Sequence, residues 1–327
     1  MMGKRVVFAE KGLVRLEEFK MKEPEPNQVL IKSTSTLISS GTEGAFLLAM
    51  PNTAQSFPQY PGYSNAGVVE TVGSDVKGVR DGDRVVSWAN HATHVLEDAT
   101  RTCAIPNGLS FDEAAFFALA SIALNGVRKA GVELGESVAI LGQGLVGQLA
   151  LQLSKLSGAV PLIAIDMLNA RLGVSLKSGA DLAINPEEGD LKEAMERATE
   201  GNGVNIVIEA TGNPNAIPLA CKLASPYGRV ILLGSTRGET KINFYSEVHK
   251  KAVTVLGAHA SMRPAHESYH GHWTDKDDAK LVLKLMERGE LKVRHLITDK
   301  LPYHKAPEAY GRAIDKSALG IILDWHQ

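Results

Sequence analysis

The chain of 327 residues is 44% hydrophobic and 22% charged, and its formal net charge is −2. This is about twice the usual length of one domain, so we expect two domains. The near-neutral charge and the lack of a long basic block argue against a nucleic-acid surface. No apolar run approaches the roughly 18 residues of a membrane span, and the first residues are too polar for a signal peptide.

Cysteine usage indicates the compartment. The chain has two cysteines, Cys103 and Cys221, and no C-x-x-C motif. This pattern offers neither a disulfide framework nor a cysteine-based zinc site, and it fits a reducing environment. We therefore expect a cytoplasmic protein that acts on a small molecule and binds neither nucleic acid nor a membrane.

The first 119 residues contain short apolar segments separated by turn signals such as Asp81-Gly82-Asp83. The predicted strands are Val6–Phe8, Leu13–Glu17, Gln28–Thr36, Ala66–Val72, Arg84–Trp88 and Thr93–Leu96. Short strands with frequent turns are typical of a barrel or sandwich-like domain. A helix predicted over residues 111–129 leads into the next domain.

From Glu136 onward, short apolar strands alternate with helical patterns. The predicted strands are Ser137–Leu141, Pro161–Ile165, Leu182–Ile184, Asn205–Glu209, Arg229–Leu233 and Val253–Gly257. The predicted helices between them cover residues 148–156, 171–177, 191–199, 216–223 and 244–251. Six strands with helical crossovers indicate an α/β fold with a doubly wound parallel sheet. Helices at 275–288 and 306–314 follow, and a strand at Ile321–Trp325 is expected to return to the first domain.

The clearest chemical signal is a glycine motif behind the first of these strands. Gly142, Gly144 and Gly147 have G-x-G-x-x-G spacing. The first glycine allows a tight turn, the second lets the backbone approach a pyrophosphate, and the third lets helix and strand pack closely. The helix predicted to follow would direct free N–H groups and its positive dipole end at the phosphates, and Leu145 and Val146 are expected to contact the cofactor as well.

Other residues extend this predicted dinucleotide site. Asp166 ends the second strand, where a carboxylate would bond the adenosine ribose hydroxyls and repel a 2′-phosphate, so we expect NAD(H) rather than NADP(H). Asp166 is alternatively an ordinary solvated acid. Arg171 either stacks on the adenine, which would soften that preference, or lies on the surface. The backbones of Thr211-Gly212 and Gly234-Ser235 end later strands and are expected to line the nicotinamide side.

The order of elements and several motifs resemble the medium-chain dehydrogenase/reductase superfamily, which includes alcohol dehydrogenases, over nearly the whole chain. The motifs are Ser40-Gly41-Thr42-Glu43, Pro61-Gly62-Tyr63, Gly67-Val68-Val69, Gly82-Asp83-Arg84-Val85, the glycine motif, Glu209-Ala210-Thr211-Gly212 and Gly228-Arg229-Val230. The resemblance implies a GroES-like catalytic domain at residues 1–119, with 261–327 returning to it, and a Rossmann domain at 120–260. It also implies an NAD(P)-dependent oxidoreductase that forms a homodimer or homotetramer.

The departures from the family pattern concern zinc. Zinc-dependent members carry a ligand cysteine where this chain has Ser40, and Gly-His-Glu where it has Gly62-Tyr63-Ser64. A glutamate ligand corresponds to Ala118, and the four-cysteine lobe of a structural zinc is missing. Ser, Tyr and Ala cannot replace a thiolate, an imidazole and a carboxylate. We therefore predict no metal ligand and no bound zinc.

Without zinc, another group must move the hydroxyl proton or polarise the carbonyl. The candidate catalytic residues near the lost zinc position are Ser40, Thr42, Glu43, Tyr63 and His91, with His94 nearby. Tyr63 occupies the lost histidine position and can donate or accept a proton. Glu43 is expected to hold Tyr63 or a backbone group, and Thr42 matches a family hydroxyl that relays a proton. Each of these side chains is alternatively a packed structural residue.

Three functions remain open from the sequence. The first is hydride transfer between NAD(H) and a secondary alcohol or ketone, including sugars and polyols. This is suggested by a short resemblance to bacteriochlorophyllide hydroxyethyl dehydrogenases and sugar-associated two-domain oxidoreductases. The second is zinc-free reduction of an activated double bond, as in quinone and enoyl reductases. The third is NAD(H) binding without turnover. The His-rich stretch 259–272 is interpreted as a loop that covers the substrate or contacts another subunit; the alternatives are ordinary surface and a metal site at His270-x-His272, which lacks the i, i+4 spacing of a helical site.

Overall fold

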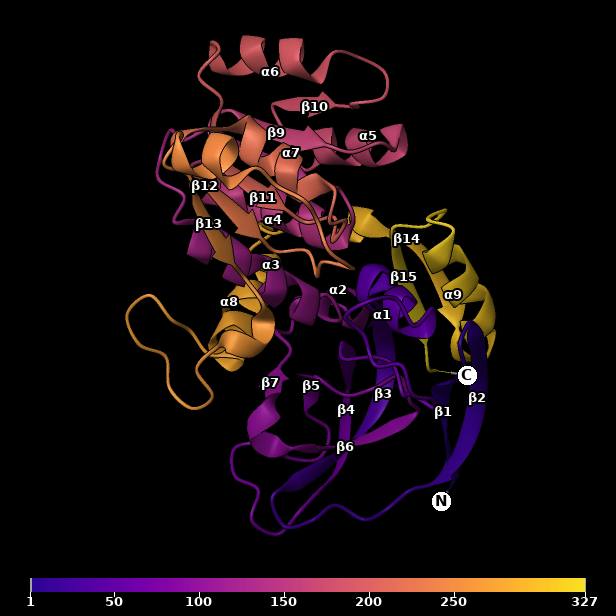
Figure 1. The fold of residues 1–327 in the computed structure, drawn as a ribbon. Helices are drawn as coiled ribbons and strands as arrows, with labels where there is room; N and C mark the ends of the chain where they lie inside the picture. The colour runs from indigo at the N-terminus through magenta and orange to yellow at the C-terminus, as the bar shows by residue number, and fades with distance from the viewer. Residues whose placement is uncertain (1, 327) are drawn as a thin grey trace. The chain divides into compact units, whose positions relative to one another are not determined.

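The computed structural model describes residues 2–326, which fall into two compact units (Figure 1). The first unit contains residues 2–119 and 279–326, and the second contains residues 120–278. The sequence predicts a return to the first domain at residue 261, whereas the structure keeps 261–278 in the second unit. Arg263 accounts for this difference, because its guanidinium donates to Ser121 O at 2.5 Å and pairs with Asp278 at 3.5 Å.

A seven-stranded sheet forms the frame of the first unit. Its strands lie in the order β14-β15-β3-β4-β5-β7, and β6 pairs with β3. The bounds are β3 Gln28–Ile38, β4 Asn65–Val72, β5 Arg84–Ser87, β6 His94–Asp98, β7 Thr102–Ala104, β14 Ile297–Pro302 and β15 Gly320–Asp324. β1 (Met2–Glu10) and β2 (Leu13–Lys20) form a separate antiparallel hairpin. The predicted β-rich domain is confirmed, although β7 and β14 lie outside the predicted strands.

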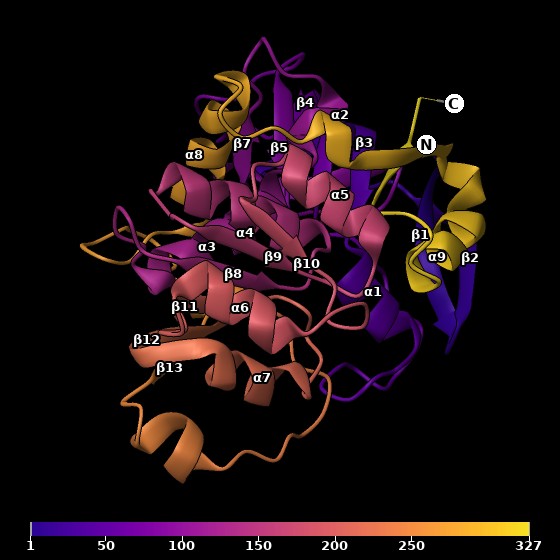
Figure 2. The same cartoon turned by 90° about the horizontal axis from the view of Figure 1, so that it is seen from above.

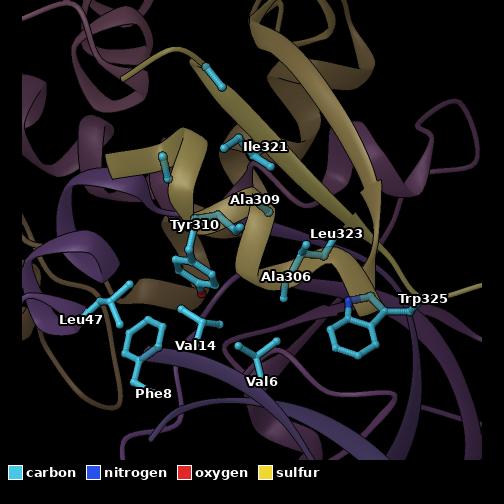
Figure 3. Packing of buried hydrophobic residues seen from close by; sticks show 13 residues of the cluster. Val6, Phe8, Val14, Leu47, Ala306, Ala309, Tyr310, Ile321, Leu323 and Trp325 are labelled. Atoms are coloured by element: carbon cyan, nitrogen blue, oxygen red, sulfur yellow. The ribbon is translucent and has the colours of Figure 1, made fainter. Parts of the chain in front are cut away.

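The C-terminal segment completes the core of this unit, as predicted for the closing strand. β15 pairs antiparallel with β3, with Ile321 opposite Ile38. Helix α9 (Ala306–Ile314) packs on the same core. Figure 3 shows Tyr310 of α9 close to Phe8, and the two rings meet edge-on with centroids 5.0 Å apart. Burial of these apolar side chains therefore joins the two ends of the chain into one unit.

The helix predicted over residues 111–129 is broken in two. α2 spans Phe111–Ala114 and α3 spans Phe117–Ala130. The Ser64 hydroxyl donates to Ala115 O, a carbonyl that a continuous helix would bond four residues later. A contact from a distant segment thus accompanies the break, and local helical periodicity contains no sign of it.

The second unit is a six-stranded parallel sheet in the order β10-β9-β8-β11-β12-β13. The bounds are β8 Val138–Leu141, β9 Leu162–Ile165, β10 Leu182–Ile184, β11 Val204–Glu209, β12 Ala224–Leu232 and β13 Thr254–Gly257. This confirms the predicted doubly wound sheet. Its strand order reverses between β8 and β11, the position where such sheets bind ligands at their carboxyl ends.

Helices cover both faces of this sheet. The bounds are α4 Leu145–Leu156, α5 Asn169–Lys177, α6 Leu191–Thr199 and α7 Ala216–Leu223, while the predicted helix 244–251 is a short π-helical turn, Tyr245–His249. Met195 of α6 and Cys221 of α7 share one apolar core with Leu141 and Val207 of the sheet. Figure 2 shows α4 and α5 on the opposite face.

A further helix, α8, spans Asp275–Glu287. Within residues 2–326, no helix combines the length and the apolar character needed to cross a bilayer.

Candidate functional site

The glycine motif in the second unit has the geometry that its spacing predicts. Gly142 has a φ of +89°, and a Cβ there would lie 2.7 Å from Thr211 Cγ2. A Cβ on Gly147 would lie 1.9 Å from Gly142 O, so a side chain at this position would separate helix from strand. At Gly144 the nearest atom to a Cβ would be Arg171 Nη1, 4.0 Å away. Two glycines are thus required by packing, while the middle one leaves open space.

The start of α4 fits a phosphate-bearing ligand. Gly144 is the N-cap and offers no side-chain cap, so the first N–H groups of the helix, around Leu145 and Val146, receive no acceptor from the N-cap side chain. Unpaired N–H groups together with the helix dipole attract anions. The arrangement suits the pyrophosphate of a dinucleotide, with open space at Gly144 for the close approach.

Asp166 lies beside this turn at the end of β9. Its Oδ2 accepts from Gln143 N at 2.6 Å and its Oδ1 accepts from Leu168 N at 2.9 Å. The side chain is only partly buried, and a carboxylate has further lone pairs for ribose hydroxyls. Arg171, on α5, places its guanidinium near Gly144. The acid and the base that the sequence singles out therefore both lie next to the glycine turn.

A buried hydrogen-bond network of amide and hydroxyl groups behind the turn was not predicted from the sequence. Ser175 Oγ donates to Gln143 Oε1 at 2.9 Å, and Gln148 Nε2 donates to Ser175 Oγ at 2.8 Å. Gln148 Nε2 also donates to Arg171 O at 3.0 Å. These bonds hold α5 against the glycine turn and fix the backbone of Arg171. The only sign of this network in the sequence is Gln143, which lies between the first two glycines at a position where the motif requires no particular side chain.

The turns after β11 and β12 pack against each other through glycines. Gly212 has a φ of +68°, and a Cβ there would lie 2.7 Å from Ser235 O. A Cβ on Gly234 would lie 2.4 Å from Gly212 N. Thr211 and Ser235 are exposed at this edge of the sheet. The structure therefore brings together the two strand ends that the sequence assigns to the nicotinamide side.

In the first unit, Glu43 and His91 are buried together. Glu43 is 3% exposed and His91 has no exposed surface. His91 Nε2 lies 3.0 Å from Glu43 Oε2 and donates to it, because a carboxylate only accepts. Since a substrate cannot touch side chains with so little exposed surface, we expect these two candidates to hold other groups in place.

Burial by itself raises the pKa of Glu43. The charge of His91 and hydrogen bonds from His91, from the Tyr310 hydroxyl and from Ser39 N outweigh it, so the pKa lies below its usual value. Ser39 N donates to Glu43 Oε1 at 2.8 Å, while Tyr310 donates to Oε2. Burial, followed by the nearby Glu43 charge, raises the pKa of Tyr310 well above its usual range. Glu43 is therefore an ionised carboxylate with donors on both oxygens.

Tyr63 connects to this group through one residue. Its hydroxyl donates to Ser39 Oγ at 2.5 Å, and the ring is only partly buried. Ser39 is the N-cap of helix α1 (Ser40–Leu47), and its hydroxyl makes no cap bond. Ser40 and Thr42 lie in the first turn of α1, where Ser40 Oγ is buried and has no hydrogen-bond partner within residues 2–326. The five candidate catalytic residues thus converge on the start of α1.

Packing at Gly62 holds the Tyr63 segment in place. Gly62 has a φ of +103°, and a Cβ there would lie 2.6 Å from His91 N. His91 N in turn donates to Pro61 O at 2.9 Å. A glycine is therefore needed for the segment before Tyr63 to lie directly on His91.

Three members of this network were missed from the sequence. Trp325 Nε1 donates to Thr36 Oγ1 at 2.8 Å, and Thr36 Oγ1 lies 2.7 Å from His91 Nδ1. Tyr310 is the third, through its bond to Glu43. Tyr310 looks like an ordinary buried aromatic residue in a helix, and Thr36 and Trp325 look like residues near strand ends. None of the three stands in a motif.

The other histidine near this region has a separate partner. His94 Nε2 pairs with Glu70 at 3.2 Å, and these residues lie on β6 and β4, which both pair with β3. Burial, which outweighs the nearby Glu70 charge, lowers the pKa of His94. Within residues 2–326, no group of three or more His, Cys, Asp or Glu side chains is placed to hold a metal ion.

Comparison with known families assigns both parts of the chain. Residues 25–135 match the family model of the alcohol dehydrogenase GroES-like domain, and residues 146–273 match that of the zinc-binding dehydrogenases. L-threonine 3-dehydrogenase of Pyrococcus furiosus is 30% identical over 341 residues, covering 93% of this chain and 92% of the relative. D-guloside 3-dehydrogenase of Escherichia coli K12 is 26% identical over 254 residues, covering 76% and 72%.

Solved structures share the fold at lower identity. An Escherichia coli oxidoreductase/dehydrogenase of unknown specificity has a TM-score of 0.87 and 20% identity over 99% of both chains. A zinc-binding dehydrogenase from Sinorhizobium meliloti 1021, solved with NADP, has a TM-score of 0.84 and 22% identity over 99% of both chains. An Escherichia coli CFT073 alcohol dehydrogenase, solved with NADH, has a TM-score of 0.84 and 18% identity over 99% of both chains. The chain belongs to the medium-chain dehydrogenase/reductase superfamily of alcohol dehydrogenase-like oxidoreductases.

Proposed function

We propose that this oxidoreductase transfers hydride between NAD(H) and a secondary alcohol or its ketone, without zinc, and that Tyr63 moves the hydroxyl proton. One observation carries the proposal. The Tyr63 hydroxyl is bonded to Ser39 Oγ at 2.5 Å, and the resemblance of Gly62-Tyr63-Ser64 to the family motif implies that Tyr63 takes the place of a zinc ligand. A phenol can donate to a carbonyl oxygen or accept from an alcohol, which is the task that zinc-bound groups perform elsewhere.

The preference for NAD(H) over NADP(H) rests on Asp166. Its carboxylate, held by Gln143 N and Leu168 N, would accept from ribose hydroxyls and repel a 2′-phosphate. Arg171 opposes this preference, because its guanidinium lies close enough to the glycine turn to attract a phosphate. Structurally similar proteins were solved with NADP or with NADH, so the fold itself does not select between them. In this proposal the balance between Asp166 and Arg171 decides which cofactor the protein prefers.

The absence of zinc is proposed from the residue types. Ser40, Tyr63 and Ala118 stand at family ligand positions, and none provides the thiolate, imidazole or carboxylate that zinc requires. His91 and Glu43 also stay engaged with each other rather than with an open site.

Substrate class is proposed from the relatives together with the proton chemistry. The relatives include a threonine 3-dehydrogenase, a guloside 3-dehydrogenase and a sorbitol dehydrogenase, all of which are named for substrates that carry hydroxyl groups. We therefore propose secondary alcohols, including sugars and polyols, as the substrate class. When bound, the nicotinamide supplies or takes up the hydride.

The residues of the chain have separate tasks in this proposal. During reduction Tyr63 turns its proton from Ser39 Oγ to the substrate oxygen, and the Ser39 hydroxyl then donates to the Tyr63 oxygen and holds it in place until the phenolate takes a new proton from solvent. Glu43 fixes Ser39 N, and His91 and Tyr310 keep Glu43 in one position. The proposed roles of these buried groups are to orient Tyr63 and to keep it from swinging away from the reacting oxygen.

The test begins with the purified protein, NAD(H) or NADP(H), and a panel of secondary alcohols, ketones, quinones and enoyl compounds. Tyr63→Phe should lower turnover of the preferred alcohol or ketone by about 10²–10⁴-fold, with cofactor affinity nearly unchanged. Thr42→Val should cause a similar loss if both hydroxyls belong to one relay, and the double variant should then be little worse than either single variant.

A matched control is Tyr60→Phe, which removes an exposed hydroxyl three residues away and should leave turnover unchanged. Near-native turnover in Tyr63→Phe would remove the tyrosine from the mechanism. Stoichiometric zinc by elemental analysis after dialysis would overturn the zinc-free proposal. Turnover confined to enoyl compounds or quinones would mean that the protein reduces activated double bonds rather than ketones. Cofactor binding with no turnover on the whole panel would contradict an enzymatic role.

A further inference from the structure

Glu209 is a buried acid that the proposed chemistry does not use. It is the last residue of β11, which lies between β8 and β12 in the sheet. The order of the strands reverses between β8 and β11, so Glu209 stands at the carboxyl edge where such sheets bind nucleotides. Its side chain has no exposed surface. An ionisable group in this place needs a physical reason.

The two carboxyl oxygens of Glu209 have unequal environments. Oε1 accepts from Thr211 N at 2.6 Å, from Gly212 N at 3.2 Å and from the Thr211 hydroxyl. Oε2 is buried and has no hydrogen-bond partner within residues 2–326. One oxygen thus holds the whole turn after β11, while the other contributes no bond that would stabilise the fold.

That turn is packed too tightly to move independently of its neighbours. On one side, a Cβ on Gly142 would lie 2.7 Å from Thr211 Cγ2. On the other side, a Cβ on Gly212 would lie 2.7 Å from Ser235 O. On each side a glycine lies directly against its neighbour with no room for a Cβ, so little space is left to absorb a shift. The position set by Glu209 is therefore passed directly to both adjoining turns.

The strand order tells which half of a dinucleotide would meet this turn. The pyrophosphate belongs at the glycine turn after β8, and Asp166, at the end of β9, would hold the adenosine ribose. β9 flanks β8 on one side and β11 flanks it on the other. A dinucleotide that starts over β9 and crosses β8 must place its other half over the ends of β11 and β12.

From these observations we infer that Glu209 is a positioning residue for the nicotinamide half of the dinucleotide, acting through the Thr211–Gly212 turn. The inference rests on the proposed use of NAD(H). Glu209 touches neither cofactor nor substrate in this role. It sets the height and tilt of the turn on which the nicotinamide side would rest, while the adenosine half depends on Gly142, Gly147 and Asp166.

The test compares two ligands on the full-length protein. NADH carries both halves, whereas 5′-ADP carries only the adenosine half and its phosphates. Glu209→Leu removes the acceptor and keeps an apolar side chain of similar size. It should weaken NADH binding by about tenfold, a typical effect of losing charge-assisted bonds, and leave 5′-ADP binding within about twofold. Calorimetric titration at a temperature where both proteins are folded measures the two constants.

The rescue variant is Glu209→Gln. Its amide oxygen can still accept from Thr211 N and Gly212 N, and its NH2 group would take the place of the oxygen that has no partner. NADH affinity should return to within about threefold of the native value. Thr211→Val, which removes only the hydroxyl donor, should weaken NADH binding by a smaller factor and leave 5′-ADP unchanged. It carries the test alone if Glu209→Leu does not fold.

Several results would overturn the inference. Equal weakening of NADH and 5′-ADP would show a general structural role for Glu209, and unchanged NADH binding in both Glu209→Leu and Thr211→Val would show no role. If the native protein binds both 5′-ADP and NADH, and every variant binds each ligand as tightly as the native protein does, the positioning role is contradicted while the cofactor proposal stays intact. A native protein that binds neither ligand would overturn the proposed use of NAD(H), and this inference with it.

Discussion

Glu43 in the first unit and Glu209 in the second are buried glutamates with opposite electrostatics. Glu43 receives donors on both oxygens, one of them from His91, and its pKa falls below the usual value although burial raises it. Glu209 receives three donors on one oxygen and none on the other within residues 2–326. Burial, which outweighs those bonds, raises its pKa. Burial raises the pKa of both groups, and only at Glu43 do donors on both oxygens, together with the nearby His91, outweigh it.

These environments give the two carboxyl groups different roles. Glu43 is locked in its ionised form by Ser39, His91 and Tyr310, and it serves as a fixed anchor behind Tyr63. Glu209 holds a single turn and lacks a second set of donors, so the fold depends on it less. A fully satisfied buried group is costly to alter, whereas a half-satisfied one can be changed with smaller consequences for stability.

The largest expected effect comes from Glu43→Gln. The amide keeps one acceptor for Ser39 N, but its NH2 group cannot accept from His91 and Tyr310. Two buried donors then lose their acceptor, and the free energy of unfolding should fall by about 3–5 kcal/mol, as for a broken buried pair. Denaturant titration at pH 7 measures the loss.

Glu209→Gln is the matched control for this prediction, because it changes an equally buried glutamate in the same way. Its amide oxygen retains the Thr211–Gly212 donors, so the loss should stay at about 1 kcal/mol or less. Equal losses in Glu43→Gln and Glu209→Gln would show that burial alone, and not the number of donors, sets the cost.

The pH dependence of the Glu43 contribution follows from the lowered pKa. A carboxyl group whose pKa falls on folding adds stability that is fully present above its ordinary value, here 4.5, and is lost as the pH falls. The stability difference between native protein and Glu43→Gln should therefore shrink below pH 4.5. A difference that grows on acidification would contradict the assignment of the lowered pKa.

A third buried carboxyl group, Asp278 in the second unit, should show the opposite slope. Burial raises its pKa to about 6 from 3.8, although Arg128 and Arg263 lower it and Asp275 and Asp277 add to the rise. The folded state then binds the proton more tightly than the unfolded state. Stability contributed by Asp278 should fall by up to about 3 kcal/mol as the pH rises from about 4 to about 6.

Asp278→Asn removes this titration, so the stability of the native protein relative to the variant should decline across that pH window. Unfolding followed by denaturant at pH 4, 5, 6 and 7 in both proteins isolates the effect. A relative stability that rises with pH would mean that the two arginines, rather than burial, control this carboxyl group.

The effect expected at the partly exposed carboxylate, Asp166, is smaller than those expected at Glu43 and Asp278. Asp166→Ala should remove the repulsion of a 2′-phosphate and shift the preference from NAD(H) toward NADP(H) by about 1–2 kcal/mol. Arg171→Ala should shift it the other way by a similar or smaller amount, because it removes the nearby cation. Calorimetric titration with both cofactors measures each shift. Tighter NADP(H) binding by the native protein, or equal responses of both variants, would contradict the roles assigned to these side chains.

Several features of the molecule were determined by the sequence alone. Glycine spacing, the alternation of strand and helix, and an acid at the end of the second strand are local patterns. Each arises from the geometry of one element or one turn, so Gly142, Gly147 and Asp166 could be placed before the fold was known. The same holds for the six parallel strands and for the residue types at the lost zinc positions.

Tertiary structure alone decided which side chains meet. Tyr310 and Glu43 are 267 residues apart in the chain, and Trp325 and Thr36 are 289 apart. No periodicity within one element records a partner on another, so this network and the bond from Tyr63 to Ser39 could not be predicted. The break between α2 and α3 has the same origin, because Ser64 reaches it from a distant segment. Sequence spacing reports contacts within an element, and only packing between elements selects the rest.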